Sequence, residues 1–154
     1  MAMLRAAVEK GSRAWFLVHR AELIQQSEAA FQRAGVPHGI IAAGYEAHHR
    51  WPVQICSVQT LVRRLDKVTP PNIIVTDECH HVVAGTWAKI LGAARGAYHI
   101  GLTATPCRMD GRGLGAHYDA MILGPSVESL IRDGFLADYD VFAPQLASTA
   151  GIHT

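Results

Sequence analysis

Short apolar runs alternate with amphipathic stretches along most of this chain. The apolar runs predict strands at residues 14–18, 39–43, 53–57, 72–77, 98–102, 120–124 and 140–143. The amphipathic stretches predict helices at residues 1–10, 21–34, 58–65, 86–95 and 127–133. Strands that alternate with helices in this way form a parallel sheet covered on both faces. The expected fold class is therefore α/β, with three layers.

Helix-capping signals refine several of these ends. Glycine follows four of the predicted helices, at positions 11, 35, 96 and 134, where a left-handed residue commonly ends a helix. Ser57 and Ser126 stand where an N-cap is expected. In the first helix the expected inward residues are Met3, Leu4, Ala7 and Val8.

Composition limits the class of protein more than its function. The chain has 154 residues, of which 49% are hydrophobic and 18% charged, as in a folded globular domain rather than a disordered one. A formal net charge of +1 excludes a grossly basic protein, so nucleic-acid contacts would depend on local groups. Three cysteines without CxxC spacing, and no visible targeting segment, favour a cytoplasmic location.

Two adjacent carboxylates end one of the buried strands. Asp77 and Glu78 directly follow the run Asn72-Ile73-Ile74-Val75-Thr76, at the sheet edge where open α/β folds place their chemistry. Neighbouring side chains point in different directions, so one can hold a hydrated Mg²⁺ while the other polarises a water molecule. The pair is the main candidate site of the chain.

A second strand end and a histidine pair surround this site in the sequence. The strand at 98–102 runs into Thr103-Ala104-Thr105-Pro106, and a glycine-rich loop is expected at 107–117. Cys79, His80 and His81, with Cys107 or His99, are side chains of the kind that bind zinc. Contiguous residues do not easily present three ligands to one tetrahedral ion, so the spacing disfavours a zinc site.

Four blocks of residues together resemble the first RecA-like domain of superfamily 2 helicases. In the family's order these blocks are His19-Arg20-Ala21-Glu22-Leu23, Ser57-Val58-Gln59-Thr60-Leu61, Asp77-Glu78-Cys79-His80 and Gly101-Leu102-Thr103-Ala104-Thr105-Pro106. They resemble motifs Ia, Ib, II (the Walker B element in its DExH form) and III. The resemblance covers nearly the whole chain and implies a RecA-like parallel sheet.

The resemblance also implies roles for individual residues. It assigns Asp77 to Mg²⁺, usually through water, and Glu78 to orienting and deprotonating the water that attacks the γ-phosphate of ATP. His80, Thr103 and Thr105 resemble the residues that link the nucleotide site to the nucleic-acid track. These roles agree with the chemistry of phosphoryl transfer, in which catalysis depends mainly on positioning and charge neutralisation.

The first two blocks imply a nucleic-acid partner. His19, Arg20, Gln59 and Thr60 resemble sequence-independent contacts to the backbone of one strand. The segments at 129–136 and 141–144 are similar to bacterial RadD-type and phage DNA-repair helicases, which favours DNA as the track. No membrane partner is expected.

One half of the family's ATP site has no counterpart in this sequence. The phosphate-binding pattern GxxxxGK[ST] does not occur, and Lys10-Gly11-Ser12 has the letters in the wrong order. The expectation is a partial RecA-like domain 1 at residues 1–144, truncated after the P-loop, followed by a tail at 145–154. The missing strand would lie beside the strand at 98–102, and the second RecA-like domain would be absent too. Such a chain is expected to hydrolyse no ATP by itself.

Two classes of function follow from these residues. The first is a fragment of an ATP-dependent DNA helicase or translocase. The second is a non-catalytic nucleic-acid-binding or interaction module that has kept the fold and lost the motor. A Mg²⁺-dependent hydrolase of small phosphoesters would require more carboxylates near Asp77, and the predicted strand ends supply none.

Overall fold

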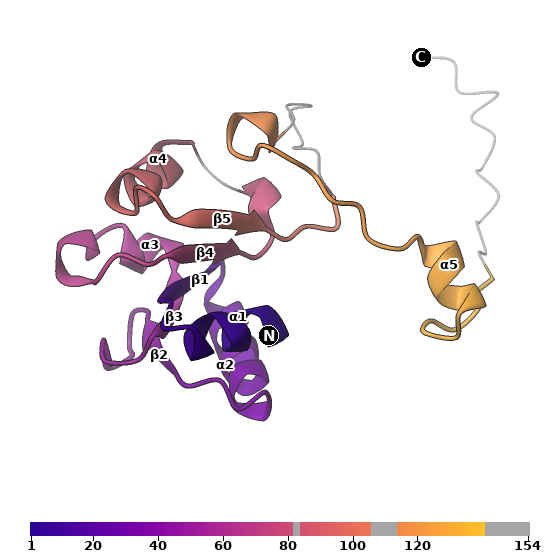
Figure 1. The fold of residues 1–154 in the computed structure, drawn as a ribbon, viewed down its shortest axis with the longest axis horizontal. Coiled ribbons are helices and arrows are strands. Elements are labelled where there is room, and N and C mark those ends of the chain that lie inside the picture. Colours follow the sequence, from indigo (N-terminus) through magenta and orange to yellow (C-terminus); the bar gives the residue numbers. More distant parts are fainter. Residues whose placement is uncertain (82–83, 106–113, 141–154) are drawn as a thin grey trace, which may run out of the picture. The chain divides into compact units, whose positions relative to one another are not determined.

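The computed structural model describes residues 1–81, 84–105 and 114–140. The chain divides into two compact units, Met1–Ala120 and Met121–Thr154. The first unit contains all the strands found among these residues, and Figure 1 labels its elements along the chain.

A parallel sheet of five strands forms the centre of the first unit. The strands are β1 (Ala14–Val18), β2 (His38–Ile41), β3 (Val53–Ser57), β4 (Ile73–Thr76) and β5 (Tyr98–Gly101). Their spatial order is β2-β3-β1-β4-β5, and every neighbouring pair is parallel. In register, Ala14 of β1 lies opposite Val53 of β3 and Ile73 of β4. The predicted α/β class with a parallel sheet is confirmed.

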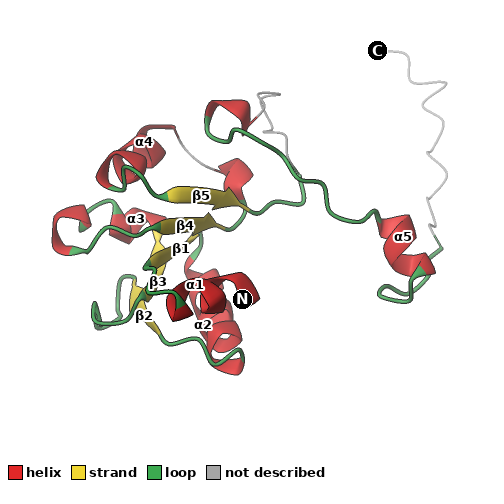
Figure 2. Ribbon diagram, in the orientation of Figure 1, coloured by secondary structure: helices red, strands yellow, loops and turns green. Residues whose placement is uncertain are grey.

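Helices cover both faces of this sheet (Figure 2). In the first unit they are α1 (Ala2–Glu9), α2 (Ala21–Arg33), α3 (Val58–Leu61) and α4 (Ala84–Ala93), with 3₁₀ turns at Leu65–Lys67, Cys79–His81 and Leu114–Ala116. Leu4 of α1 and Phe31 of α2 belong to one buried cluster, whereas Leu61 of α3 and Trp87 of α4 belong to the other. The three-layer arrangement is therefore present.

The position of β1 in the middle of the sheet explains why its sequence is apolar throughout. All five of its residues are buried, because helices pack on both of its faces. Phe16 and Val18 point toward α1 and α2, and Trp15 and Leu17 toward α3 and α4. The rings of Phe16 and Phe31 meet edge to face, with centroids 5.3 Å apart, which fixes α2 on the sheet.

Two predicted helices of the first unit differ in detail from expectation. In α1, Leu4 is buried but Met3 is 45% exposed, so the inward assignment of Met3 is wrong. Leu4 and Val8 lie four residues apart and form the line that packs on the core. The helix expected at 58–65 is a single turn followed by a 3₁₀ turn, and of its expected inward residues only Leu61 is fully buried.

The two N-cap predictions have different outcomes. The Ser126 hydroxyl accepts a hydrogen bond from the backbone N–H of Ser129 (3.1 Å), as predicted for the cap of α5 (Val127–Arg132). Ser57 is the N-cap residue of α3, as predicted, but its side chain makes no cap bond. Its hydroxyl donates instead to Oε1 of Gln59 (3.0 Å). The Ser57 prediction is therefore confirmed in position but not in its side-chain bond.

The strand predicted at 120–124 is not formed. Met121, Ile122 and Leu123 are 66%, 95% and 77% exposed and have no regular secondary structure. An apolar run becomes a strand only where a partner strand satisfies its backbone, and none of the described residues pairs with it. The strand predicted at 140–143 and most of the loop predicted at 107–117 lie outside the described residues.

Strand β5 ends the sheet on one side. Among the described residues no further strand pairs with it, and its first residue, Tyr98, is 78% exposed. Across those residues, no helix has both the length and the apolar character needed to cross a membrane.

Candidate active site and nucleic-acid interface

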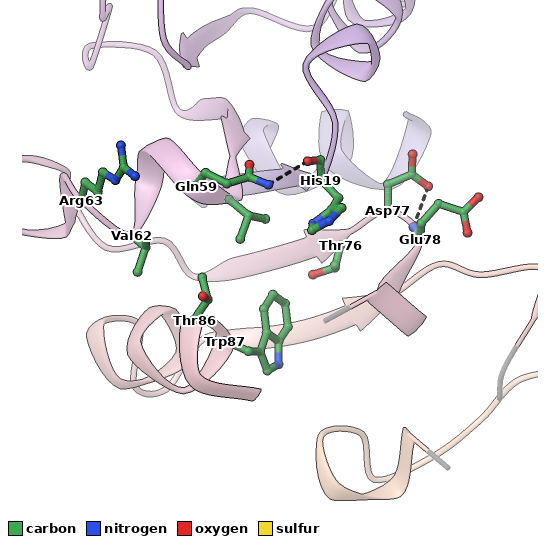
Figure 3. Close-up of a pocket in the computed structure, with 10 residues that line it drawn as sticks. His19, Gln59, Val62, Arg63, Thr76, Asp77, Glu78, Thr86 and Trp87 are labelled. Carbon is green, nitrogen blue, oxygen red and sulfur yellow. Dashed lines mark hydrogen bonds between the residues drawn. The ribbon is translucent and has the colours of Figure 1, made fainter. Parts of the chain in front are cut away.

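The two carboxylates follow β4 in a fixed turn. The backbone N–H of Asp77 donates to the carbonyl of Leu17 (3.0 Å), which ties the turn to β1. Glu78 has a φ of +50°, a left-handed conformation that is uncommon for a residue other than glycine and is often found at functional sites. Its N–H donates to Oδ1 of Asp77 (3.1 Å), the contact drawn in Figure 3. Both side chains are partly exposed.

The end of β5 is bound to the same turn. The N–H of Leu102 donates to the carbonyl of Thr76 (2.8 Å), and the N–H of Cys79 donates to the carbonyl of Leu102 (3.0 Å). Tyr118 and the thiol of Cys79 pack over Gly101, where an added Cβ would lie 2.6 Å from Cζ of Tyr118 and 2.7 Å from the sulfur. The strand ends that carry the two predicted blocks are thus held side by side.

His80 joins the two strand ends through side chains. Its Nδ1 lies 2.7 Å from Oγ1 of Thr103, 3.3 Å from Oε2 of Glu78 and 3.4 Å from Oγ1 of Thr105. The Thr103 hydroxyl donates to the carbonyl of Thr105 (3.0 Å). A hydroxyl has only one proton, so the hydrogen of the His80–Thr103 contact belongs to Nδ1. The Nδ1–H of His80 therefore contacts both Glu78 and Thr103, which follows the end of β5.

The predicted nucleic-acid residues lie at the ends of β1 and β3. The Nε2 amide of Gln59 donates to the carbonyl of His19 (3.0 Å), so the structure brings these two residues together. Both polar atoms of the Gln59 amide are bound within the chain, because its Oε1 accepts from Ser57. Arg20 directly precedes α2 and is exposed, whereas Thr60 is partly buried in α3.

A cavity of about 290 Å³ lies between α3 and α4, next to the carboxylates (Figure 3). Its lining consists of His19, Val58, Gln59, Val62, Arg63, Thr76, Asp77, Glu78, Thr86 and Trp87. Sequence reasoning did not place Arg63, Thr76 or Thr86 at a site. The signal for Arg63 was its spacing, since it follows Gln59 by four residues.

Metal chemistry at this edge would depend on few protein ligands. Within residues 1–81, 84–105 and 114–140, no three or more His, Cys, Asp or Glu side chains gather closely enough to hold a metal ion. A hydrated Mg²⁺ commonly uses one or two carboxylates, with waters and phosphate oxygens as its other ligands. Asp77, fixed at the strand end, can supply one such carboxylate.

Burial makes two thiols of this unit, those of Cys56 and Cys79, sensitive to alkaline pH. Burial raises the pKa of Cys56 well above its usual value, and it also raises the pKa of Cys79. Each thiol therefore keeps its proton more firmly in the folded state. This contribution to stability is fully present below the unfolded pKa of about 8.5 and is lost as pH rises above it. We expect the free energy of unfolding, measured by urea denaturation, to fall above about pH 8.5.

The variant Cys56→Ala serves as the control for this pH dependence. It is expected to be less stable at neutral pH because a buried side chain is truncated, but its stability should fall less between pH 8 and 10. An equal slope in the wild-type and variant proteins would contradict the assignment.

Most of the chain matches a known protein family. The family described as "Type III restriction enzyme, res subunit" matches residues 1–108, which include both strand ends of the site. The chain belongs to this family of superfamily 2 helicases. Its parallel sheet is accordingly that of a first RecA-like helicase domain.

Two relatives of this helicase-family chain are longer proteins. A 51.5 kDa protein of Lactococcus phage (isolate 7-9) is 39% identical over 139 residues, which are 90% of this chain and 28% of the phage protein. IRC3 of Saccharomyces cerevisiae, whose name assigns it to the ATP-dependent helicases, is 32% identical over 133 residues, or 79% of this chain and 19% of IRC3. The chain thus spans less than a third of either relative.

Solved helicase structures share the fold of the domain. UvsW of bacteriophage T4 superposes with a TM-score of 0.57 and 18% identity, covering 68% of this chain and 23% of the UvsW chain. The Hef helicase domain of Pyrococcus furiosus gives a TM-score of 0.54 and 23% identity, covering 68% of this chain and 26% of that domain's chain. These likenesses concern the fold alone.

Proposed function

We propose that this domain forms part of an ATP-dependent DNA helicase or translocase and supplies the carboxylate half of its ATP site. The observation that carries the proposal is the His80 network, which joins Glu78 to Thr103 and Thr105 across two strand ends. The matched family and the helicase name of one relative support the same class of activity.

Within the proposed site the two carboxylates have different tasks. Asp77 is fixed by its backbone bond to β1 and would hold Mg²⁺ through water. Bound Mg-ATP would supply the phosphoryl group, and its Mg²⁺ would neutralise the charge that develops on the phosphate oxygens. Glu78, which has a φ of +50° in the turn, would orient a water molecule and take its proton.

The proposed site needs groups that these 154 residues do not contain. No GxxxxGK[ST] pattern occurs in the sequence, so the backbone amides and lysine that cradle the phosphates would come from elsewhere. His80 would couple the carboxylates to the nucleic-acid side, because its N–H is shared between Glu78 and Thr103.

The nucleic-acid track is proposed to run over the ends of β1 and β3. Arg20 offers an exposed cation there, and the Gln59–His19 bond holds the two loops together. Contacts of this type bind the phosphate backbone of one strand and carry no sequence information. The second proposed partner is the other RecA-like domain of the motor.

Arg20→Ala is expected to weaken binding of single-stranded DNA several-fold, because one phosphate contact is lost. The dependence of log K on log salt should become shallower by about 0.7. Fluorescence anisotropy at several salt concentrations measures both quantities. The matched control is Arg33→Ala, which removes the same charge at the opposite end of α2.

Equal losses in the two arginine variants would show that only net charge matters and would count against the proposed track. The non-catalytic module would instead be favoured by two results together. The chain would bind DNA through Arg20, and it would form no complex that has ATPase activity. The Gln59–His19 bond serves either function, so DNA binding alone does not separate them.

A further inference from the structure

Tyr118 lies outside the blocks that carry the proposed ATP chemistry, yet its side chain reaches the turn that holds the two carboxylates. Its backbone N–H donates to the carbonyl of Leu114 (3.2 Å), which ties it to the 3₁₀ turn before it. Its hydroxyl hydrogen-bonds with the side chains of Thr76 and Cys79, which are 4% and 2% exposed. A phenol has one proton, so it can donate to one of these side chains and accept from the other. Tyr118 therefore bridges two buried groups of the turn.

The end of β5 leaves room for this bridge because residue 101 is a glycine. An added Cβ at Gly101 would lie 2.6 Å from Cζ and 2.7 Å from the hydroxyl oxygen of Tyr118. The same Cβ would lie 2.7 Å from the sulfur of Cys79. The phenol and the thiol thus share one small space beside the end of β5, next to the candidate site.

The place of the bridge in the sequence indicates what it does. Thr76 directly precedes Asp77, and Cys79 directly follows Glu78, so the Tyr118 hydroxyl bonds to the residue on either side of the carboxylate pair. Glu78 has a φ of +50°, and a conformation of this kind persists where surrounding contacts hold it. A side chain that only filled the space beside Gly101 would need no hydroxyl, since burying one is costly unless it is hydrogen-bonded.

We propose that Tyr118 is a positioning residue, which bridges Thr76 and Cys79 and thereby holds the Glu78 carboxylate in the orientation for attack of water on ATP. Tyr118 touches neither ATP nor the water and acts through Glu78. This inference rests on the proposed ATPase function and adds a residue to its site.

The first measurement is native-state hydrogen exchange of the 154-residue chain and its Tyr118→Phe variant, followed by NMR. The variant keeps the ring and removes the bridge, so the amides of Cys79 and Leu102 should exchange about threefold to tenfold faster, as fits the loss of one hydrogen bond. The amide of Ala14, which donates to the carbonyl of Pro52 at the opposite end of β1, should keep its wild-type rate. Equal acceleration of all three amides would indicate a general loss of stability and would overturn the inference.

The second measurement is ATP hydrolysis by a chimaera in which this chain replaces the matched 139-residue stretch of the phage relative, whose remaining sequence is proposed to supply the phosphate-cradling groups. Tyr118→Phe is expected to lower kcat about threefold to tenfold and to leave KM for ATP unchanged, because those groups lie elsewhere. When Glu78→Gln is already present, the same change should have no further effect. A merely structural role would lower the rate by the same factor with and without Glu78→Gln.

Variants of Thr76 test the bridge from its other end. Thr76→Val keeps the shape, removes the hydroxyl and should reproduce both effects of Tyr118→Phe, whereas Thr76→Ser retains the hydroxyl and should keep the wild-type values. Tyr139→Phe is the matched control, because Tyr139 is 63% exposed, and it should change neither measurement.

The outcomes separate this inference from the proposed function. Wild-type exchange of Cys79 and Leu102 in both Tyr118→Phe and Thr76→Val would overturn the inference and leave the proposed function intact. An undiminished kcat in these two variants would do the same, and so would an equal fractional loss with and without Glu78→Gln. An inactive chimaera beside an active phage protein would contradict the proposed function and this inference together.

Discussion

Replacing Gly39 by alanine is expected to lower the free energy of unfolding by about 2–4 kcal/mol. An added Cβ at Gly39 would lie 2.5 Å from the carbonyl oxygen of His48 and 2.6 Å from Oε1 of Gln54. The Gln54 amide is buried and donates to the carbonyls of His48 (3.1 Å) and Trp51 (2.9 Å). The methyl group would therefore push on a backbone and break the bonds that fix the loop between β2 and β3.

Urea denaturation of the variant measures this effect, and Gly92→Ala is the matched control. Gly92 is an exposed residue of α4 with no atom within 4 Å of an added Cβ. Alanine there should stabilise the helix by up to about 1 kcal/mol. The account of the Gly39 contact is wrong if both alanine variants unfold at the same urea concentration as the wild-type chain.

The sequence predicted the strands of the sheet more closely than the helices around it. The bounds of β1 and β3 are those expected. In β1 the reason is visible in the sequence, because a strand buried on both faces is an unbroken apolar run. The run at Met121–Leu123 is also apolar but remains exposed, since strand pairing depends on a partner strand that the local pattern does not reveal. The one-turn length of α3 likewise depends on tertiary packing rather than on its apolar spacing.

The sequence predicted the residues of the candidate site but not the hydrogen bonds among them. Asp77 and Glu78 could be found because two carboxylates at a strand end are visible in the sequence. The contact of His80 with Thr103 spans 23 residues, and the positive φ of Glu78 is a property of the folded turn. The internal hydrogen bonds of Gln59 were also not foreseen, because its spacing indicates only a helix surface.

Loss of Glu78 is the prediction with the largest expected effect on activity. Removing a general base commonly costs about 10²–10⁴-fold in rate. The 154-residue chain is expected to hydrolyse no ATP by itself, since its sequence contains no phosphate-cradling pattern. The loss therefore has to be measured where the other half of the site is present. We propose to measure it in a chimaera in which this chain replaces the matched 139-residue stretch of the phage relative, whose remaining sequence is proposed to supply that half.

Glu46→Gln is the matched control in that chimaera. Glu46 is an exposed glutamate in the loop before β3, and its change to glutamine removes the same charge. The phage protein with its own sequence is the second control, and its rate of ATP hydrolysis, measured with and without DNA, sets the reference rate.

The most direct measurement is phosphate release from ATP by the chimaera, with and without single-stranded DNA. The account predicts DNA-stimulated hydrolysis that Glu78→Gln reduces at least about 100-fold and Glu46→Gln leaves unchanged. An inactive chimaera beside an active phage protein would contradict the claim that this domain supplies the carboxylate half of an ATP site, and so would a Glu78→Gln chimaera that hydrolyses ATP at the full rate.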